Sequence, residues 1–456
     1  MDGRDNTTRL ERKAVLRPCL EIGKGCVNAP APAGNAMTTP STVQVLQTKL
    51  SRAAKQSLDR RFGALYDKIY RRDVLKEAWK RVRANKGAPG IDEQDFEWIE
   101  QVHGVRKFLD ALRRDLKRQR YRPKPVKRCW IEKPGKPDKR PLGIPVIRDR
   151  VVQTACKLVI EPIYETNFLA CSYGFRPKRS AKMAILTIQR AITHAKQTVI
   201  VDCDIRGFFD NVDHTILLHL VRRRISDPRM LKLIGGWLRA GVMEDGKYTP
   251  PDGTGTPQGG VISPLLANVY LHSLDKMFKE SDLSGTWVRY ADDIVIAAWG
   301  GGQHILKRLR QMLGRLKLEL SEAKTRVVKS EDGFDFLGVH FKLCPITRPG
   351  KRLEKACRVW PSNRSMQRIR QKVKDRIGRR YSKSLEEMIE ELNPVLRGWH
   401  NYHKAVDPYP RRLLILNRFV WNRLRIFLKR KHNDPTRSAW RLRGGLPASL
   451  GLYQFA

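Results

Sequence analysis

Two adjacent carboxylates stand inside an otherwise apolar stretch of the sequence. Asp292 and Asp293 follow Trp287–Tyr290 and precede the β-branched run Ile294–Ile296. This pattern predicts two strands joined by a tight turn, with both carboxylates at its tip. Adjacent like charges repel and Asp is depleted in strands, so a divalent cation is a physical reason for such a pair. A solvated Asp-Asp turn is the alternative if the pair stands alone.

A third candidate carboxylate lies upstream, at the end of another predicted strand. In the run that begins at Val199, alternation places Asp202 and Asp204 on one face, with Asp204 at the strand end. Asp204, Asp292 and Asp293 could together hold two hard cations about 3.5–4 Å apart. One cation would activate a 3′-hydroxyl and the other would hold a triphosphate and its leaving group. That is the chemistry of nucleotidyl transfer.

The charge balance of the 456-residue chain indicates a polyanionic partner. The 90 Lys and Arg residues against 46 Asp and Glu leave a formal charge of +44. Because phosphates neutralised by Lys and Arg release counterions, nucleic acid explains the excess better than a membrane surface, its rival. The sequence has no apolar run long enough to span a membrane, no signal peptide and no C-x-x-C pair. We expect a soluble intracellular protein with free thiols.

The first third of the chain is basic and interrupted by turn signals. Residues 1–50 are expected to form a flexible leader, because the Pro-rich stretch near their end cannot bury enough surface to fold alone. Two basic amphipathic helices are predicted within 58–82. The basic, Pro-rich stretch 106–150 is expected to be extended and to face phosphates rather than to form a long helix.

From residue 199 short β-branched runs alternate with helical stretches, which predicts an α+β body. The expected strands are 199–203, 287–290, 294–299 and 334–341. The expected helices are 213–224, which Asp210 and Asp213 would cap, and 265–278. After residue 358 three helical stretches remain, and they predict a separate helical bundle. These stretches are 364–380, 385–399 and 411–431.

Seven segments, in a fixed order, resemble the bacterial group II intron reverse transcriptase/maturase family. They are Asn85–Asp92, Arg140–Pro145, Ser172–Pro177, Asp204–Asp210, Thr256–Pro264, Tyr290–Asp293 and Phe336–Gly338. The resemblance implies a right-hand polymerase, with reverse transcriptase fingers and palm over 51–345 and an N-terminal extension at about 58–100. An all-α thumb/maturase domain over 358–430 would follow.

The resemblance also implies the roles of individual residues. Asp204, Asp292 and Asp293 would be catalytic and, with Ile205, would hold two Mg²⁺ ions, for which Mn²⁺ can substitute. Phe209 would lie beneath the incoming sugar, where a ring clashes with a ribose 2′-hydroxyl, whereas its neighbour Phe208 suits the core. The other nucleotide-binding residues implied are Lys133, Arg140, Gln258 and Lys324. For Lys324 a solvated helix end is an equal alternative.

In the C-terminal part, Gly398–His403 resembles the family's maturase-specific signature, in which Trp399 suits the core. RNA contacts are expected from one face of the helix at 364–380 and from the signature itself. These residues are Arg364, Arg368, Lys372, Arg376, Tyr402 and His403. Residues 431–456 would be a short basic DNA- or RNA-binding remnant without an endonuclease domain, so we expect no second-strand cleavage by this protein.

The resemblance implies a cytoplasmic bacterial protein that binds its group II intron RNA, assists splicing and copies the intron into DNA for mobility. Its partners would be intron RNA, an RNA template, a DNA primer or target and dNTPs, with no membrane. Two alternatives stay open: a splicing-only maturase with a vestigial polymerase site, and a domesticated reverse transcriptase in antiviral defence or CRISPR spacer acquisition. RNA binding is expected to depend steeply on salt.

Overall fold

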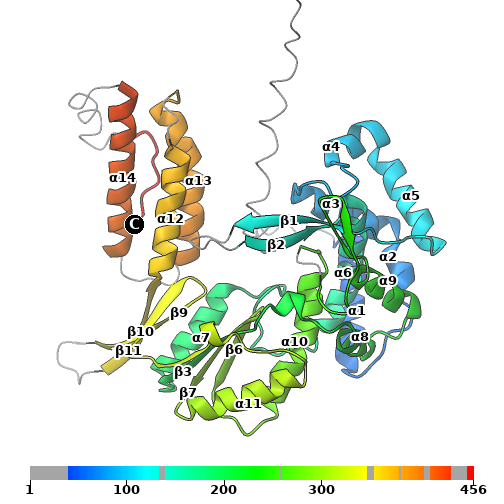
Figure 1. Ribbon diagram of the computed structural model, residues 1–456, viewed down its shortest axis with the longest axis horizontal. Helices are drawn as coiled ribbons and strands as arrows, with labels where there is room; N and C mark the ends of the chain where they lie inside the picture. The colour runs from blue at the N-terminus through cyan, green and yellow to red at the C-terminus, as the bar shows by residue number, and fades with distance from the viewer. Residues whose placement is uncertain are drawn as a thin grey trace, which may run out of the picture.

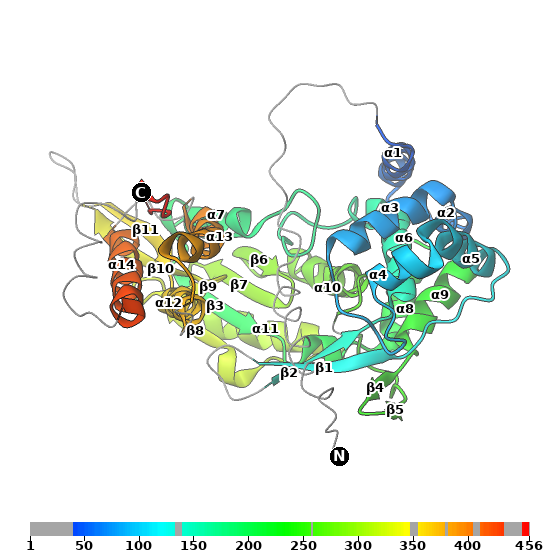
Figure 2. The ribbon, with the colours of Figure 1, turned by 90° about the horizontal axis from the view of Figure 1, so that it is seen from above.

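The computed structural model describes residues 40–132, 139–256, 259–346, 354–378, 382–404, 411–432 and 449–455. A body of mainly N-terminal helices and a bundle of C-terminal helices lie at opposite ends of the molecule, with a β-sheet between them (Figures 1 and 2). The predicted order, an α+β body followed by a helical bundle, is confirmed. Within these ranges no helix is long and apolar enough to cross a membrane.

The central sheet is antiparallel and has the order β6-β7-β3-β8. Its strands are β3 (Val199–Asp204), β6 (Thr286–Tyr290), β7 (Asp293–Ala298) and β8 (Arg326–Lys329). The helices that cover it are α7 (Ala181–Thr193), α10 (Ser263–Lys279) and α11 (Gly302–Gly314). Val201 and Ile296 share a core with α10 and α11, whereas Ile200 and Val295 share one with α7. Both faces are buried, which explains the continuous β-branched runs.

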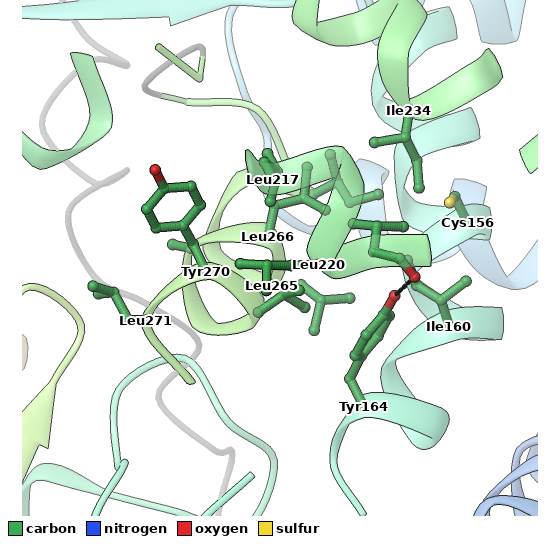
Figure 3. Close-up of a cluster of buried hydrophobic side chains, with 14 of the residues drawn as sticks. Cys156, Ile160, Tyr164, Leu217, Leu220, Ile234, Leu265, Leu266, Tyr270 and Leu271 are labelled. Atoms are coloured by element: carbon green, nitrogen blue, oxygen red, sulfur yellow. Dashed lines mark hydrogen bonds between the residues drawn. The ribbon is translucent and has the colours of Figure 1, made fainter. Parts of the chain in front are cut away.

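The helical body surrounds α6 (Ile147–Tyr164), which is buried over most of its length. Its other helices are α1 (Thr42–Gln56), α2 (Tyr66–Ile69), α3 (Arg72–Ala84), α4 (Phe96–Trp98), the π-helix η1 (Ile99–His103), α5 (Val105–Lys117), α8 (His214–Arg222) and α9 (Pro228–Leu238). Figure 3 shows apolar side chains of α6, α8, α9 and α10 packed together, with Tyr164 donating a 2.9 Å hydrogen bond to the Val221 carbonyl. One apolar core therefore joins the helical body to the central sheet.

A second sheet, of order β2-β1-β4-β5, carries the predicted nucleotide-binding residue Arg140. Its strands are β1 (Val126–Glu132), β2 (Lys139–Ile144), β4 (Val242–Glu244) and β5 (Lys247–Thr249). In the antiparallel β1–β2 pair, Arg140 is the partner of Ile131. Figure 1 shows this pair between the helical body and the bundle, above the central sheet.

A third sheet, of order β11-β10-β9, leads from the central sheet into the bundle. Its strands are β9 (Phe334–Phe336), β10 (Val339–Ile346) and β11 (Glu354–Pro361). The bundle consists of α12 (Asn363–Ile377), α13 (Leu385–His403) and α14 (Arg411–His432), close to the predicted bounds. Ser384 and Glu387 form a capping box at the start of α13. The apolar stripes of the three helices form a core of their own.

The predicted flexible leader is wrong at its C-terminal end, because α1 begins at Thr42. Ser41 and Gln44 form a capping box there, each accepting a hydrogen bond from the other's backbone N–H. Val43, Leu46 and Leu50 are buried in the main core. The end of the supposed leader is therefore an integral helix, and residues 1–39 lie outside the described part of the chain.

Two other predictions need correction. The stretch 106–150 is not extended throughout, since α5 occupies its start; Phe108, Leu112 and Leu116 form a buried helical stripe before the first proline. The expected strand over 334–341 is two strands, β9 and β10. They are separated by a turn at Leu337 and Gly338, whose φ angles are +49° and +78°.

Residues 449–455, at the end of the predicted nucleic-acid-binding remnant 431–456, pack into the bundle. Leu452 and Phe455 are buried in the core of the bundle. Asn393 of α13 bonds the backbone of Gly451 and Tyr453, at 2.9 and 2.7 Å. Asn417 of α14 forms hydrogen bonds with the backbone N–H and carbonyl of Phe455. This segment is therefore part of the bundle. Residues 433–448 lie outside the described part of the chain.

We predict that Phe455→Ala lowers the free energy of unfolding of the bundle by about 3–5 kcal/mol, because it removes a ring from a packed core. Leu414→Ala is the control, since Leu414 on α14 is 56% exposed and its truncation should cost under about 0.5 kcal/mol. Urea unfolding followed by hydrogen exchange in α13 and α14 measures both. Equal stability of the two variants would show that residues 449–455 do not belong to the bundle core.

Candidate active site

The two-residue turn between β6 and β7 carries Asp292. Tyr290 pairs with Asp293 in this hairpin, which leaves Ala291 and Asp292 as the loop. Ala291 has a φ of +59°, a left-handed conformation that is costly for a residue with a Cβ atom. The predicted hairpin, with the two carboxylates at its tip, is confirmed.

The pairing of β3 with β7 brings the third carboxylate to this hairpin. Asp204, the last residue of β3, is the direct partner of Asp293. Direct partners in antiparallel strands have Cα atoms about 4.5–5.5 Å apart and side chains on the same face. Asp202 lies two residues earlier, but its carboxylate accepts a 3.0 Å hydrogen bond from Arg326 Nε. The three predicted carboxylates therefore meet at one edge of the central sheet.

Burial, together with the crowding of negative charge, raises the pKa of the two hairpin carboxylates. Desolvation, followed by the charges of Asp292 and Asp204, raises the pKa of Asp293 to about 7. Desolvation and then the Asp204 charge also raise the pKa of Asp292, whereas Arg140 and Lys324 oppose that rise. Because these groups disfavour one another's charge, a bound cation would stabilise their ionised forms.

Lys324 supplies a positive charge at this edge. It ends the short 3₁₀ helix η3 (Glu322–Lys324), and its ammonium forms an ion pair with Asp204. A bridge between Ile205 and Leu320 places η3 there, with Ser321 N donating to the Asp204 carbonyl at 2.8 Å. Lys324 is thus more than a solvated helix end, and it lies beside the catalytic candidates.

The carboxylates fit a hard divalent cation in their chemistry but are not arranged as a finished ligand set. In the ranges that the structure describes, no three His, Cys, Asp or Glu side chains form a ready metal cluster. The Asp204 carboxylate is instead paired with Lys324. Carboxylate oxygens are nevertheless the ligands that Mg²⁺ takes, and their mutual repulsion favours such an ion. Ile205, the fourth predicted metal-site residue, follows Asp204 directly.

The two phenylalanines after β3 differ in their burial, as predicted. They lie in a 3₁₀ helix, η2 (Phe208–Asp210). Phe208 is buried in the main core, whereas Phe209 is half-buried and packs against it. Asp213 caps α8 as predicted, accepting a 2.9 Å hydrogen bond from Ile216 N, but Asp210 is part of η2.

Thr256 approaches Phe209, and Gly259 approaches β2. Thr256 N donates a 2.7 Å hydrogen bond to the Phe209 carbonyl. Gly259 has a φ of +114° and lies so close to β2 that a Cβ atom there would be 2.4 Å from the Gly143 carbonyl oxygen. Arg140, on the same strand, is exposed, and its charge acts on Asp292. The predicted ligands Lys133 and Gln258 lie outside the described residues.

In the bundle, the predicted RNA-binding residues divide into two groups. The four predicted residues of α12 are all exposed, whereas the apolar stripe of this helix is buried; they are Arg364, Arg368, Lys372 and Arg376. Tyr402 is 42% exposed, and its hydroxyl donates a 2.7 Å hydrogen bond to the Leu337 carbonyl. These residues stay candidates for RNA contact.

His403 corrects the prediction that it reaches RNA. Its side chain is 2% exposed and packs inside the bundle, 3.0 Å from Ser365 Oγ. Burial lowers its pKa to about 4, so the ring is neutral near pH 7 and brings no charge to a phosphate. Trp399, expected in the core, packs against the same region and donates to Ser365 Oγ at 3.1 Å.

Sequence reasoning missed two buried polar residues that support the site. Gln153 of α6 accepts a 2.8 Å hydrogen bond from Val261 N, and so braces the loop that contains Gly259. Arg289 is fully buried and donates to the Ala291 carbonyl inside the hairpin turn at 3.0 Å. Its position as a charged residue within an apolar strand could have indicated that Arg289 is buried and paired.

Two family models match the chain. The model for the reverse transcriptase (RNA-dependent DNA polymerase) matches residues 131–341, which include all three carboxylates. The model for the group II intron maturase-specific domain matches residues 366–444, which include most of the bundle. The sheet that carries the carboxylates is therefore part of a reverse transcriptase domain, and a maturase-specific domain follows it.

Curated relatives agree with both matches. The group II intron-encoded protein LtrA of Lactococcus lactis subsp. cremoris is 32% identical, over 66% of this chain and 60% of LtrA. Protein YkfC of Escherichia coli (strain K12) is 35% identical, over 65% of this chain and 87% of YkfC. An uncharacterized 91 kDa protein in the cob intron of Schizosaccharomyces pombe is 27% identical, over 75% of this chain and 50% of that protein. The chain thus spans about 60% of the length of LtrA. It belongs to the group II intron reverse transcriptase/maturase family.

Proposed function

We propose that this protein is an RNA-directed DNA polymerase and an intron maturase of the bacterial cytoplasm. It binds group II intron RNA, assists splicing and copies the RNA into DNA from a DNA primer or target. The observation that carries the polymerase half is the meeting of Asp204, Asp292 and Asp293 at one sheet edge. Lys324 is paired with Asp204, and the charge of Arg140 acts on Asp292. A splicing-only protein has no need of such an arrangement.

In this proposal the central sheet is the palm of a right-hand polymerase, and the β1–β2 pair with the helical body forms the fingers. Together they occupy about residues 51–345, with the N-terminal extension at about 58–100. The bundle over 358–430 is the thumb. Its position at the far end of the central sheet from the fingers supports this division (Figure 1).

Two Mg²⁺ ions, or Mn²⁺ in their place, would be held by Asp204, Asp292, Asp293 and Ile205. When bound, they would lower the pKa of the primer 3′-hydroxyl and stabilise the negative charge on the departing pyrophosphate. The carboxylates would keep the site anionic enough to hold both ions. Lys324, which pairs with Asp204 in this structure, would exchange that partner for the triphosphate.

The incoming dNTP would lie between β2 and the carboxylates. Arg140 would bind the triphosphate through its planar fork, with Lys133 and Lys324 as further cationic ligands. Phe209 would contact the sugar, since the half-buried ring follows directly on the carboxylate strand. Gln258 would contact the nucleotide from the loop that Gly259 presses against β2.

The exposed basic face of α12 would bind RNA phosphates. Its residues recur every four positions and so lie along one side of the helix. Tyr402 would add a contact near the turn between β9 and β10, which its hydroxyl already touches. The net charge of +44 would supply most of the affinity through counterion release.

We predict that Asp292→Asn lowers primer extension on an RNA template by at least about 100-fold, because it removes one charge from the metal-binding set. Asp202→Asn is the matched control: it lies on the same face of β3 as Asp204 but pairs with Arg326, and it should keep the rate within about threefold. Steady-state extension with dNTPs and Mg²⁺ measures both. Full activity of Asp292→Asn would refute the assigned catalytic role.

The salt dependence of RNA affinity reports how many phosphates the basic face of α12 contacts. Changing the four α12 residues Arg364, Arg368, Lys372 and Arg376 to Gln should reduce the slope of log K against log[salt] by about 3, since each phosphate contact contributes about 0.7–0.9. Filter binding of intron RNA at several salt concentrations measures the slope.

The matched control changes four exposed basic residues of α10, α11 and the turn that follows α11 to Gln, and it should leave the slope unchanged. These residues are Lys276, Lys279, Lys307 and Arg315. An equal loss in both variants would mean that α12 contributes only general positive charge and not an RNA-binding face.

A further inference from the structure

Arg289, one residue before the Tyr290–Asp293 segment, is completely buried and fully hydrogen-bonded. A guanidinium has five N–H donors, and here each has an acceptor. Nε and Nη2 donate to the two carboxylate oxygens of Asp275 at 2.8 and 2.6 Å. Nη2 also donates to Ser172 Oγ at 2.8 Å, and Nη1 donates to Asn268 Oδ1 and to the Ala291 carbonyl, both at 3.0 Å. The side chain therefore has one defined position.

The acceptors come from elements that are far apart in the sequence. Asp275 and Asn268 lie two turns apart on α10, and both are buried. Trp287 of β6 donates to Asp275 at 2.9 Å, so the carboxylate is held from two sides. The buried network thus fixes the hairpin against α10.

A third segment completes the support beneath the turn. The backbone of Ser172 forms a bridge with Arg289, and Asn268 Nδ2 donates a 2.9 Å hydrogen bond to the Gly174 carbonyl. A Cβ atom on Gly174 would stand 2.4 Å from Ala291 N, so the two backbones are in direct contact. The turn has no room to relax toward this side.

The Ala291 carbonyl is the point at which the network meets the site. Ala291 has a left-handed backbone, and strain of this kind persists only where the surroundings impose it. The bond from Arg289 is a charge-assisted one in a dry environment, where such bonds are strong. It constrains the peptide that leads directly into Asp292.

We propose that Arg289 is a positioning residue that holds the Ala291 turn and thereby sets where Asp292 stands relative to Asp204. This inference rests on the proposed polymerase function of these carboxylates. Stability alone does not account for the arrangement, because a buried ion pair is often no more stabilising than an apolar pair of similar volume. The donor directed at Ala291 is what an apolar pair cannot supply.

The test measures metal binding without nucleic acid, from the electron paramagnetic resonance signal of free Mn²⁺. Arg289→Lys keeps the charge next to Asp275 but cannot reach all of the acceptors at once. Loss of such an outer support typically costs 10–100-fold in metal affinity, so the Mn²⁺ dissociation constant should rise about tenfold or more. Primer extension should recover in part at saturating Mn²⁺.

Arg224→Lys is the matched control. Arg224 is equally a buried arginine, but it donates to the carbonyls of Ala54 and Ser57 in the helical body. It should lose thermal stability and keep the wild-type Mn²⁺ affinity. If both variants weaken metal binding alike, the effect follows from stability and the proposal is overturned.

If Arg289→Lys does not fold, a second variant tests the same proposal. Arg289→Met with Asp275→Leu removes both buried charges together, and such pairs often keep their stability. Wild-type Mn²⁺ affinity in this folded variant would overturn the proposal, and an affinity reduced tenfold or more would support it. Asp292→Ala is measured alongside: if it too binds Mn²⁺ like the wild type, the assigned metal site fails, which is a different result from failure of Arg289 alone.

Discussion

The antiparallel pairing of β3 with β7 is the constraint on which the site depends. It makes Asp204 the partner of Asp293, while the short β6–β7 turn presents Asp292 beside them. A slip of one residue in this register would turn Asp204 to the opposite face of the sheet. The register is secured because both faces are buried, so any slip would also misplace Ile200, Val201, Val295 and Ile296. The core of the sheet therefore holds charges together that would otherwise separate.

The remaining elements bring basic groups and loops to this edge. Arg140 arrives on β2, Lys324 on η3, and the loop at Gly259 is pressed against β2 and braced by Gln153. Each comes from a different part of the chain, and the apolar core shared by the helical body and the central sheet includes Leu320, just before η3, and Ile262, just after the loop. Binding of nucleotide and RNA would add to an arrangement that folding has largely prepared.

Local patterns made much of this predictable. The strands and the hairpin followed from β-branched runs around Asp292 and Asp293, and the three bundle helices from apolar stripes such as that of α12. Two errors arose where proline residues lie close to a helix in the sequence. Prolines after Pro123 concealed the helix α5, and the Pro-rich stretch before Thr42 concealed the start of α1. Burial of His403 and Phe455 depends on tertiary packing, which no local pattern of basic or aromatic residues reveals.

The buried polar supports were beyond prediction for a related reason. In the sequence, Arg289 is a charged residue in an otherwise apolar strand. Its role is visible only from its partners on α10 and at Ser172. Its contribution depends on contacts between residues that are far apart in the sequence. In the same way the ion pair of Lys324 with Asp204 requires the bridge between Ile205 and Leu320.

The central claim is that Asp204, Asp292 and Asp293 hold the catalytic metal ions. Anomalous diffraction from crystals of the protein with a primer–template, a non-extendable dNTP and Mn²⁺ tests it most directly. The account predicts anomalous peaks about 2.0–2.3 Å from oxygens of these three carboxylates, with the triphosphate on the side of Arg140. Ordered nucleotide with Mn²⁺ bound elsewhere, or bound by none of the three, would contradict it.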